Sequence, residues 1–431
     1  MPPWRKFINV EPHGIPASSM KKLTISGLIL LIMISGTAFC QDRPRVIRIL
    51  ATGKAESTPV LAIWFNAEPS TDATIFPTRT WGAVNPEDIR RYMRIYFPRT
   101  FEELLDYEFI FLAQVDITFF TLEQQRWLHD ALTNHPRAGV NTRSVMSANS
   151  PLNEPWQASI LQEVFPNDVD AVIADSRNFQ GESGPLVIND DPALPNVMKP
   201  FKSQIESIFT GYGGLNTIPR PGSYILSYTK NSKGIGSPVP GQIAHVFYWR
   251  WNNSITFTFR DMVYDPFWSP KESSVSNPYF LDIIANMIWF STGRELPQDP
   301  LQVHLYRRLV YDFNIRRSLL ISLLDFAELF GANPVRQYED LDGIDGVVRE
   351  TVSLYLDRSY DGAYDAMEEA MDMLAELDKD AAKLKDRALL WVYLVEWSVT
   401  TAVFLVAGVV LWTLMVRRRL YREVGATKWV R

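Results

Sequence analysis

The sequence predicts an α/β protein with a flavodoxin-like, doubly wound, mainly parallel sheet, followed by an α-helical region and one C-terminal transmembrane helix. Three observations lead to this prediction. Short apolar runs alternate with helical patterns and with Pro- and Gly-rich loops as far as Pro297. Beyond Pro300 the chain turns into long helical patterns that are almost free of Pro and Gly clusters. Finally, the segment from Trp397 to Val416 holds twenty residues without a charge.

Residues 1–40 are predicted to be an upstream extension plus a signal peptide. From Met20 the chain has a basic start, an apolar stretch and small residues before Gln41, which is the three-part layout of a secretory signal. Met20 is therefore the expected true start. Lipid attachment at Cys40 is an alternative, although the residues before Cys40 lack the Leu and small-residue pattern that such a site needs.

An α/β domain is predicted to cover residues 43–297. Its expected strands are short β-branched or aromatic runs bounded by turn-forming residues, as buried strands are. They lie at Val46–Leu50, Val60–Phe65, Tyr92–Phe97, Tyr107–Gln114, Val169–Ala174, Tyr224–Tyr228, His245–Trp249 and Ser254–Phe259. Helices are expected to begin at Thr100, with Glu103 as capping-box partner, and at Thr121. Strands that alternate with helices call for a parallel sheet covered on both faces.

Three segments carry a resemblance to a known fold. YEFIFLAQVDITFFTLEQQRWLHDAL resembles the strand, loop and helix of the class I glutamine amidotransferase-like fold, and GPLVINDDPALPNV resembles the loop after the middle of its sheet. IAHVFYWRW and NPYFLDIIANMIWFSTGRELP resemble the closing strand and last helix. The likeness covers Arg45 to Pro297. This part of the chain is similar to trehalose-utilisation-type domains and to the amidotransferase-like domains of membrane-bound proteins.

The resemblance also shows what this chain lacks. Catalytic members place a cysteine in a tight Gly-x-Cys-x-Gly turn between a strand and a helix. Here Cys40 is the only cysteine, and the matching place from Ala138 to Ser147 offers Ser144 and Ser147 without flanking glycines. The resemblance therefore implies a domain without its catalytic nucleophile, and glutaminase activity is not expected.

Five residues are candidates for ligand binding. Asp116 follows a predicted strand, and open α/β sheets bind ligands at the carboxyl ends of their strands. His245 and Asp261 are the other candidates that could gather with Asp116 around one cleft at this edge. Trp249 and Trp251 belong to a dense aromatic segment, and exposed Trp side chains stack on sugar rings. Structural roles are the alternatives to ligand binding. Asp116 could cap the next helix, and the aromatic residues could pack between the sheet and a helix.

Composition narrows the range of partners. The net charge of -6 argues against nucleic acid, because a phosphate-binding surface needs an excess of Lys and Arg. The five histidines form no HxxxH or HExxH pair, and the single cysteine leaves no thiolate site, so no metal or other cofactor is expected.

Residues 301–387 are predicted to form a helical stalk or a small bundle. The spacing of Ala363, Met367, Ala370, Leu374 and Leu377 gives one helix face a stripe of small and apolar side chains. Its simplest partners are the preceding helices of the same chain. A protein partner or self-association through residues 301–387 is the alternative.

The carboxyl-terminal region predicts a single-pass membrane anchor over residues 391–416. The uncharged run matches a hydrocarbon core of about 30 Å at roughly 1.5 Å rise per residue. Arg417, Arg418 and Arg419 mark the cytoplasmic side, so residues 417–431 form a basic cytoplasmic tail and the large domain is extracytoplasmic.

Taken together, the sequence predicts a membrane-anchored, extracytoplasmic protein whose role is non-enzymatic binding or assembly. The rival hypothesis is an extracytoplasmic hydrolase or carbohydrate-processing protein that uses Asp and His groups at the edge of the sheet. A cluster of Asp116, His245 and Asp261 around one cleft would favour the rival, and a filled edge would favour the binding protein.

Overall fold

The computed structural model describes residues 46–54, 58–79, 85–142, 153–168, 184–206, 208–210, 218–230, 241–261, 263, 266–268 and 277–427. The predicted signal peptide, Cys40 and the expected strand Val169–Ala174 lie outside these residues, as do Ser144 and Ser147. Residues 44–431 form one compact unit, so the sheet and the helices that follow it are described together.

A nine-stranded mixed sheet forms the centre of the α/β domain, with strand order β2-β1-β3-β4-β9-β8-β7-β5-β6. The strands are β1 (Ile47–Lys54), β2 (Thr71–Arg79), β3 (Phe109–Ala113), β4 (Ala138–Thr142), β5 (Gly184–Ile188), β6 (Phe209–Thr210), β7 (Tyr224–Lys230), β8 (Gln242–Trp251) and β9 (Ser254–Phe259). From β2 to β9 neighbouring strands run parallel, whereas β9, β8, β7, β5 and β6 pair antiparallel. The prediction of a mainly parallel sheet was therefore wrong for this second half.

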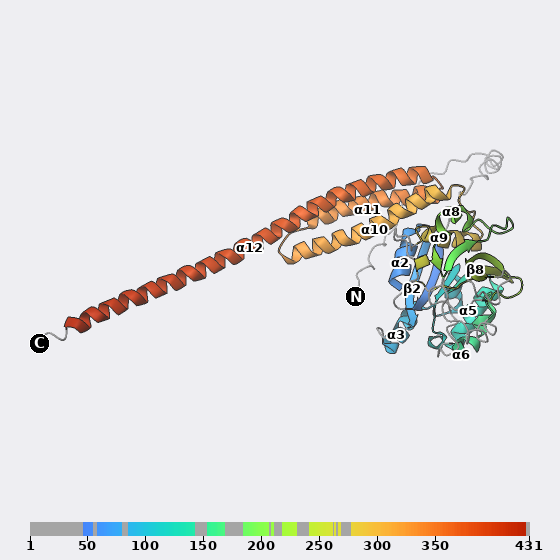
Figure 1. The fold of residues 1–431 in the computed structure, drawn as a ribbon, viewed down its shortest axis with the longest axis horizontal. Helices are drawn as coiled ribbons and strands as arrows, with labels where there is room; N and C mark the ends of the chain where they lie inside the picture. Colours follow the sequence, from blue (N-terminus) through green and yellow to red (C-terminus); the bar gives the residue numbers. More distant parts are fainter. Residues whose placement is uncertain are drawn as a thin grey trace, which may run out of the picture. The chain divides into compact units, whose positions relative to one another are not determined.

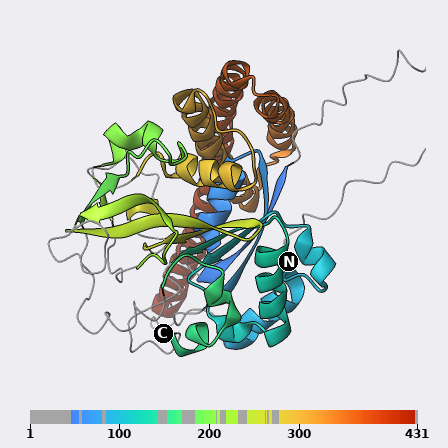
Figure 2. The ribbon, with the colours of Figure 1, turned by 90° about the vertical axis from the view of Figure 1, so that its right-hand side faces the viewer.

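Helices cover both faces of the parallel half. They are α2 (Thr58–Ala67), α3 (Pro86–Tyr96), α4 (Phe101–Leu105), α5 (Leu122–Asn134) and α9 (Phe280–Ser291), with the short α6 (Asn153–Gln157) and α8 (Lys202–Ile205) at the periphery. Side chains of β3 alternate between two cores: Phe109 and Phe111 pack with α2 and α9, and Ile110 and Leu112 pack with α3, α4 and α5. Figure 2 shows α9 on one side of the sheet and the cyan and teal helices on the other.

The predicted helix starts at Thr100 and Thr121 are confirmed. Thr121 accepts a hydrogen bond from the Gln124 N–H while the Gln124 side chain accepts one from the Thr121 N–H, which completes a capping box. At Thr100 the hydroxyl caps the N–H of Glu103, but the Glu103 carboxylate accepts from the N–H of Arg99. The strand predictions at Tyr107–Gln114, Tyr224–Tyr228, His245–Trp249 and Ser254–Phe259 agree with β3, β7, β8 and β9.

Two predicted strands are helices. Val60–Phe65 lies in α2, where Leu61, Trp64 and Phe65 are buried against the sheet. Tyr92–Phe97 lies at the end of α3, which Asn85 caps and in which Ile89 and Met93 are the buried residues. Both runs are short and apolar or aromatic, and periodicity alone does not separate a buried strand from a buried helix turn.

Three long helices follow the sheet: α10 (Pro300–Leu329), α11 (Val335–Leu356) and α12 (Tyr360–Thr427). They alternate in direction, because Tyr306 of α10 bonds Thr351 of α11 while, farther along, Arg317 pairs with Asp345. The predicted stripe on α12 packs against α10 and α11, since Ala363, Met367, Ala370 and Leu374 are fully buried. Figure 1 shows the three helices side by side, with α12 continuing beyond the turn between α10 and α11.

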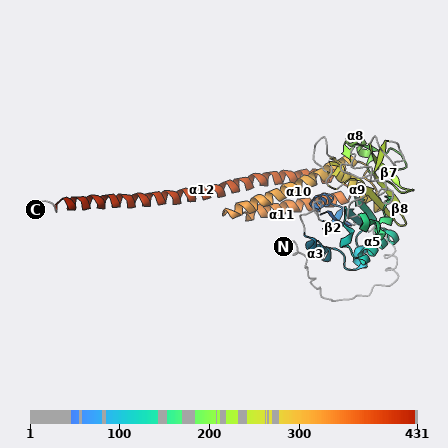
Figure 3. The ribbon, with the colours of Figure 1, turned by 60° about the horizontal axis from the view of Figure 1, so that its bottom comes forward.

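The apolar carboxyl-terminal segment is a continuation of α12. After Ala388 the side chains become exposed, including Trp391, Trp397 and Trp412. This helix is long and apolar enough to cross a membrane, and no part of its most apolar window is buried inside the structure. Figure 3 shows that α12 runs unbroken from the bundle into this segment. The predicted stalk and anchor are therefore parts of one helix.

Candidate functional site

The five predicted ligand residues lie at two opposite edges of the sheet. His245 lies in the first half of the antiparallel strand β8, which begins at Gln242, and Asp261 follows β9, so both lie at the carboxyl edge of the parallel strands. Trp249 and Trp251 lie at the other end of β8, where Trp251 pairs with Ser254 at the start of β9. The structure does not bring the five residues together around one cleft.

At the carboxyl edge, His245 links a serine to an aspartate. Its Nε2 lies 2.6 Å from Asp261 Oδ2, and its Nδ1 lies 3.0 Å from Ser227 Oγ on β7. With Nε2 protonated, Nδ1 accepts the hydroxyl proton of Ser227, which is the relation of roles found in Ser-His-Asp triads. All three side chains are fully buried, and the imidazole packs edge-on against Phe267. Substrate therefore has no access to this serine in the structure.

Asp116 acts as a cap in the structure. It is half-buried, and its Oδ1 accepts hydrogen bonds from the N–H and the hydroxyl of Thr118 at the start of a 3₁₀ turn. These bonds are typical of a structural cap.

The two tryptophans stack on each other at the far edge. Their ring centroids are 4.9 Å apart, and the guanidinium of Arg220 lies over the Trp249 ring at 5.6 Å. The Trp249 indole N–H donates to the carbonyl of Val164, and the Trp251 indole N–H donates to Thr133. Both side chains are thus engaged within the protein, and sugar stacking at this place stays a prediction.

Strain and unpaired polar groups mark the carboxyl ends of β3 and β4. Gln114, directly after β3, has φ of 57°, a conformation that residues with a side chain rarely adopt. Among the described residues, the side-chain amides of Gln114 and Asn141 and the hydroxyl of Thr142 are buried without a hydrogen-bond partner. Since buried polar groups are normally paired, this edge has the donors and acceptors to hold water or a small polar ligand.

A second cluster joins the α/β domain to the helices. Arg307 of α10 is buried and donates from Nε to Glu68, just after α2, at 2.6 Å, and from Nη1 to Asp282 of α9 at 2.9 Å. The carboxylate of Glu68 also accepts from the Tyr355 hydroxyl at 3.0 Å, and Asp282 lies 2.7 Å from Nδ1 of His304. Residues of α2, α9, α10 and α11 therefore share one ion network.

The surroundings of Arg307 favour its charged form. Burial disfavours the charged guanidinium, but Glu68, Tyr355 and Asp282 outweigh it, so the pKa of Arg307 is raised. Burial also raises the pKa of the Tyr355 phenol well above its ordinary value, which keeps the proton available for Glu68. A buried ion pair of this kind is strongly destabilised when one partner is removed, since the other charge is left unpaired.

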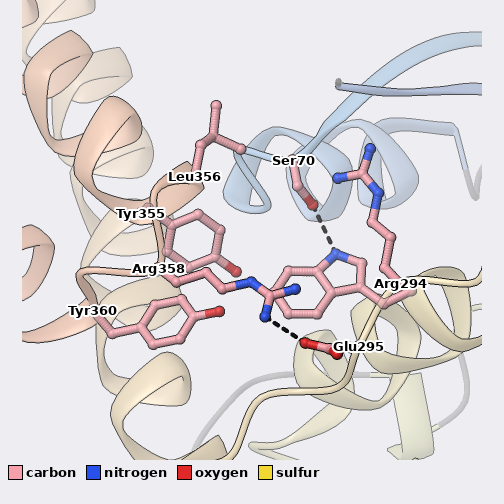
Figure 4. Close-up of a pocket in the computed structure, with 8 residues that line it drawn as sticks. Ser70, Arg294, Glu295, Tyr355, Leu356, Arg358 and Tyr360 are labelled. Carbon is pink, nitrogen blue, oxygen red and sulfur yellow. Dashed lines mark hydrogen bonds and ion pairs between the residues drawn. The ribbon is translucent and has the colours of Figure 1, made fainter. Parts of the chain in front are cut away.

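A pocket opens beside the network, as Figure 4 shows. Residues of the α/β domain line one side and residues at the turn between α11 and α12 line the other: Ser70, Trp289, Arg294, Glu295, Tyr355, Leu356, Arg358 and Tyr360. Arg358 has φ of 63° and bonds Glu295 at 2.7 Å across the junction. Among the residues that the structure describes, no group of three or more His, Cys, Asp or Glu side chains could hold a metal ion.

Sequence reasoning missed the junction. Two signals were present: Asp282 is a charge inside the apolar helix FLDIIANMIWF, and Arg307 shares a helix face with the apolar Val303 and Val310. Nothing near Glu68 distinguishes it, because its partner is 239 positions away.

Comparison with known proteins gives little beyond this geometry. No protein-family model and no curated protein sequence matches the chain. Among solved structures, a cytoplasmic protein from Salmonella typhimurium LT2 is 13% identical with a TM-score of 0.41, over 57% of this chain and 99% of its own. A protein described as ThuA-like from Parabacteroides merdae ATCC 43184 is 13% identical with a TM-score of 0.32, over 59% of this chain and 94% of its own. Similarities at these TM-scores carry no conclusion, so the fold is defined by the strand order and registers alone.

Proposed function

We propose that this protein is a membrane-anchored, extracytoplasmic binding or assembly protein whose amidotransferase-like domain is catalytically empty. One observation carries the proposal: the buried network around Arg307 fixes the α/β domain to helices that continue into an apolar segment long enough to span a membrane. A domain fixed in this way presents its surface at a set distance from the bilayer. In this proposal the C-terminus with Arg417, Arg418 and Arg419 lies in the cytoplasm.

Two observations support a non-enzymatic role: the sole cysteine, Cys40, precedes the α/β domain, and the polar side chains around His245 at the carboxyl edge of the sheet are buried. A hydrolase needs a nucleophile that its substrate reaches, whereas Ser227, His245 and Asp261 are fully buried.

The test compares co-purification by two forms of the chain that keep the junction intact. Full-length protein and a form ending at Arg387 are tagged, purified from the host cells, and analysed by quantitative mass spectrometry. The proposal expects one protein enriched in near-stoichiometric amount with both forms, because the α/β domain and the bundle hold the binding surface. Enrichment of no protein with either form, when the purified full-length protein is also monomeric, would contradict it.

A hydrolase is the second candidate, and one observation favours it. Ser227, His245 and Asp261 form a hydrogen-bonded chain at the carboxyl edge of the parallel strands, where open α/β sheets bind ligands. A fluorophosphonate probe that reacts with activated serines distinguishes the two. Labelling of the full-length protein that disappears in Ser227→Ala would establish the hydrolase and overturn the binding role. The proposal expects labelling no stronger than that of Ser227→Ala.

A further inference from the structure

One face of α10 carries a heptad repeat that points away from its own bundle. Alternating steps of four and three residues connect nine positions: Leu301, Leu305, Arg308, Asp312, Ile315, Leu319, Ser322, Phe326 and Leu329. Six of the nine are apolar, and all six are among the exposed large hydrophobic side chains, with Leu319 65% and Leu329 83% exposed. The buried face of α10, with Val303, Val310 and Leu324, lies on the opposite side of the helix.

We infer that this face, the α10 heptad stripe, binds the same stripe of a second copy of the chain in a parallel two-stranded coiled coil. A repeat of mostly apolar side chains every 3.5 residues is the pattern of a coiled-coil seam, and the α10 packing face inside the bundle does not require it. This inference rests on the proposed anchoring, since two copies held in one membrane by α12 have their α10 helices parallel. It gives the proposed assembly function a specific partner.

Charge at the centre of the stripe fits a self-complementary pair. Arg308 and Asp312 occupy two successive seam positions, with Arg308 Nε 3.8 Å from Asp312 Oδ2 within one chain. In a parallel pair related by a two-fold axis each seam residue faces its own equivalent, so the Arg308–Asp312 ion pair within each copy offsets the like charges that meet there. Polar residues at seam positions fix the register at some loss of stability. The apolar layers on either side, Leu305 above and Ile315 and Leu319 below, then meet their equivalents.

The test is disulfide formation between full-length copies in membranes. In a background with Cys40→Ser, single substitutions Leu305→Cys and Leu319→Cys are exposed to a mild oxidant, and dimer is measured on non-reducing gels. A cross-link requires Cα atoms within about 7 Å. Leu305→Cys and Leu319→Cys are expected to form dimer several-fold faster than Ser318→Cys, an exposed α10 residue one position off the stripe. Self-linking at both levels occurs only if the helices are parallel.

Equal rates at Leu319→Cys and Ser318→Cys, or no dimer at any position, would overturn the inference. Dimer at only one of the two seam levels would show an antiparallel or crossed contact and would also overturn it. If these cross-links fail while a different protein co-purifies with both forms of the chain, self-association is wrong and the binding role stands.

Discussion

Arg307 is the residue that couples the α/β domain to the helices, because its carboxylate partners lie just after α2 and in α9 while its own backbone belongs to α10. Its side chain is 2% exposed, and it also lies over the Trp289 ring at 5.2 Å. Without the Arg307 guanidinium, Glu68 and Asp282 would be buried carboxylates with no positive charge from arginine beside them. The network therefore favours one arrangement of the helices against the α/β domain, with Tyr355 and Ser70 also bonded to Glu68 and His304 bonded to Asp282.

Replacing Arg307 tests this coupling. Arg307→Met leaves Glu68 and Asp282 buried and unpaired, so the free energy of unfolding is expected to fall by about 3–5 kcal/mol. Thermal or denaturant unfolding in detergent, followed by circular dichroism, measures the change. The matched control is Arg336→Met, whose side chain is 84% exposed and 3.8 Å from Asp340, and which is expected to change stability by less than about 0.5 kcal/mol. Similar melting of both variants would contradict the assigned role.

The buried phenol of Tyr306 is expected to lower the free energy of unfolding at alkaline pH. Burial raises the pKa of its phenol to about 12, partly opposed by the hydrogen bond with Thr351. Because this folded pKa lies above the ordinary value of 10.0, the contribution is complete below about pH 10 and is lost as the pH rises towards 12. Tyr306→Phe has no proton to lose and should show a smaller fall in stability over this window, measured by unfolding at successive pH values. Tyr96→Phe, at an exposed phenol, should follow the unmodified protein.

At the scale of elements, the stripe on α12 holds the bundle together. Leu374 is fully buried against α10 and α11, whereas its neighbour Met373 is 38% exposed. Leu374→Ala is expected to destabilise the protein by about 2–5 kcal/mol, because it leaves a cavity that the helices cannot fill. Met373→Ala should change stability by less than about 0.5 kcal/mol. Chemical denaturation of the form ending at Arg387 compares the two, and an equal effect would argue against the assigned packing.

The sequence predicts elements well where local chemistry decides their type. Caps at Thr100 and Thr121 and the long periodic helices after Pro300 depend on contacts within a few residues. β3 is apolar throughout because both of its faces are buried. By contrast, Val60–Phe65 is apolar throughout, and α2 contacts both the sheet and α10, so its sequence lacks a clear 3.6-residue pattern. The strands β2 and β4 were not predicted, since TDATIFPTR and AGVNT contain too few apolar residues to indicate a core.

The candidate sites divide in the same way. His245 and Asp261 were predicted from the position of their strands in the fold, and they are hydrogen-bonded. Asp116 was chosen because it follows a predicted strand, but its side chain caps the next turn. Trp249 and Trp251 were chosen by residue type, and their indole N–H groups are bonded to neighbours that only the folded chain reveals. The Arg307 network lies beyond sequence reasoning because it joins residues from four separate helical regions.

At the scale of the whole molecule, the helices complete the α/β domain. α10 contacts both α2 and α9, and Val303, Tyr306 and Val310 belong to the same hydrophobic core as Trp64 and Ile283. A form ending at Pro297 is therefore expected to aggregate or to be recovered in low yield, since it exposes this core and leaves Glu68 and Asp282 without Arg307. A form ending at Arg387 keeps the core and lacks the exposed apolar part of α12, so it should be monodisperse without detergent. Gel filtration of the two forms makes the comparison, and a well-folded short form would contradict it.

The unbroken α12 makes the protein a rigid lever. Its 68 residues span about 100 Å, and about 55 Å of this length lies between Tyr360 and Trp397. Because Arg307, Tyr355 and the bundle hold the α/β domain fixed at the far end, rotation about a hinge is not available to absorb movement. If the apolar end of α12 lies in a bilayer as proposed, a tilt of that end by about 10° would swing the α/β domain sideways by about 10 Å, given the helical rise. Under the proposed anchoring, changes in bilayer thickness, which alter the tilt of such helices, would thereby become displacements of the α/β domain.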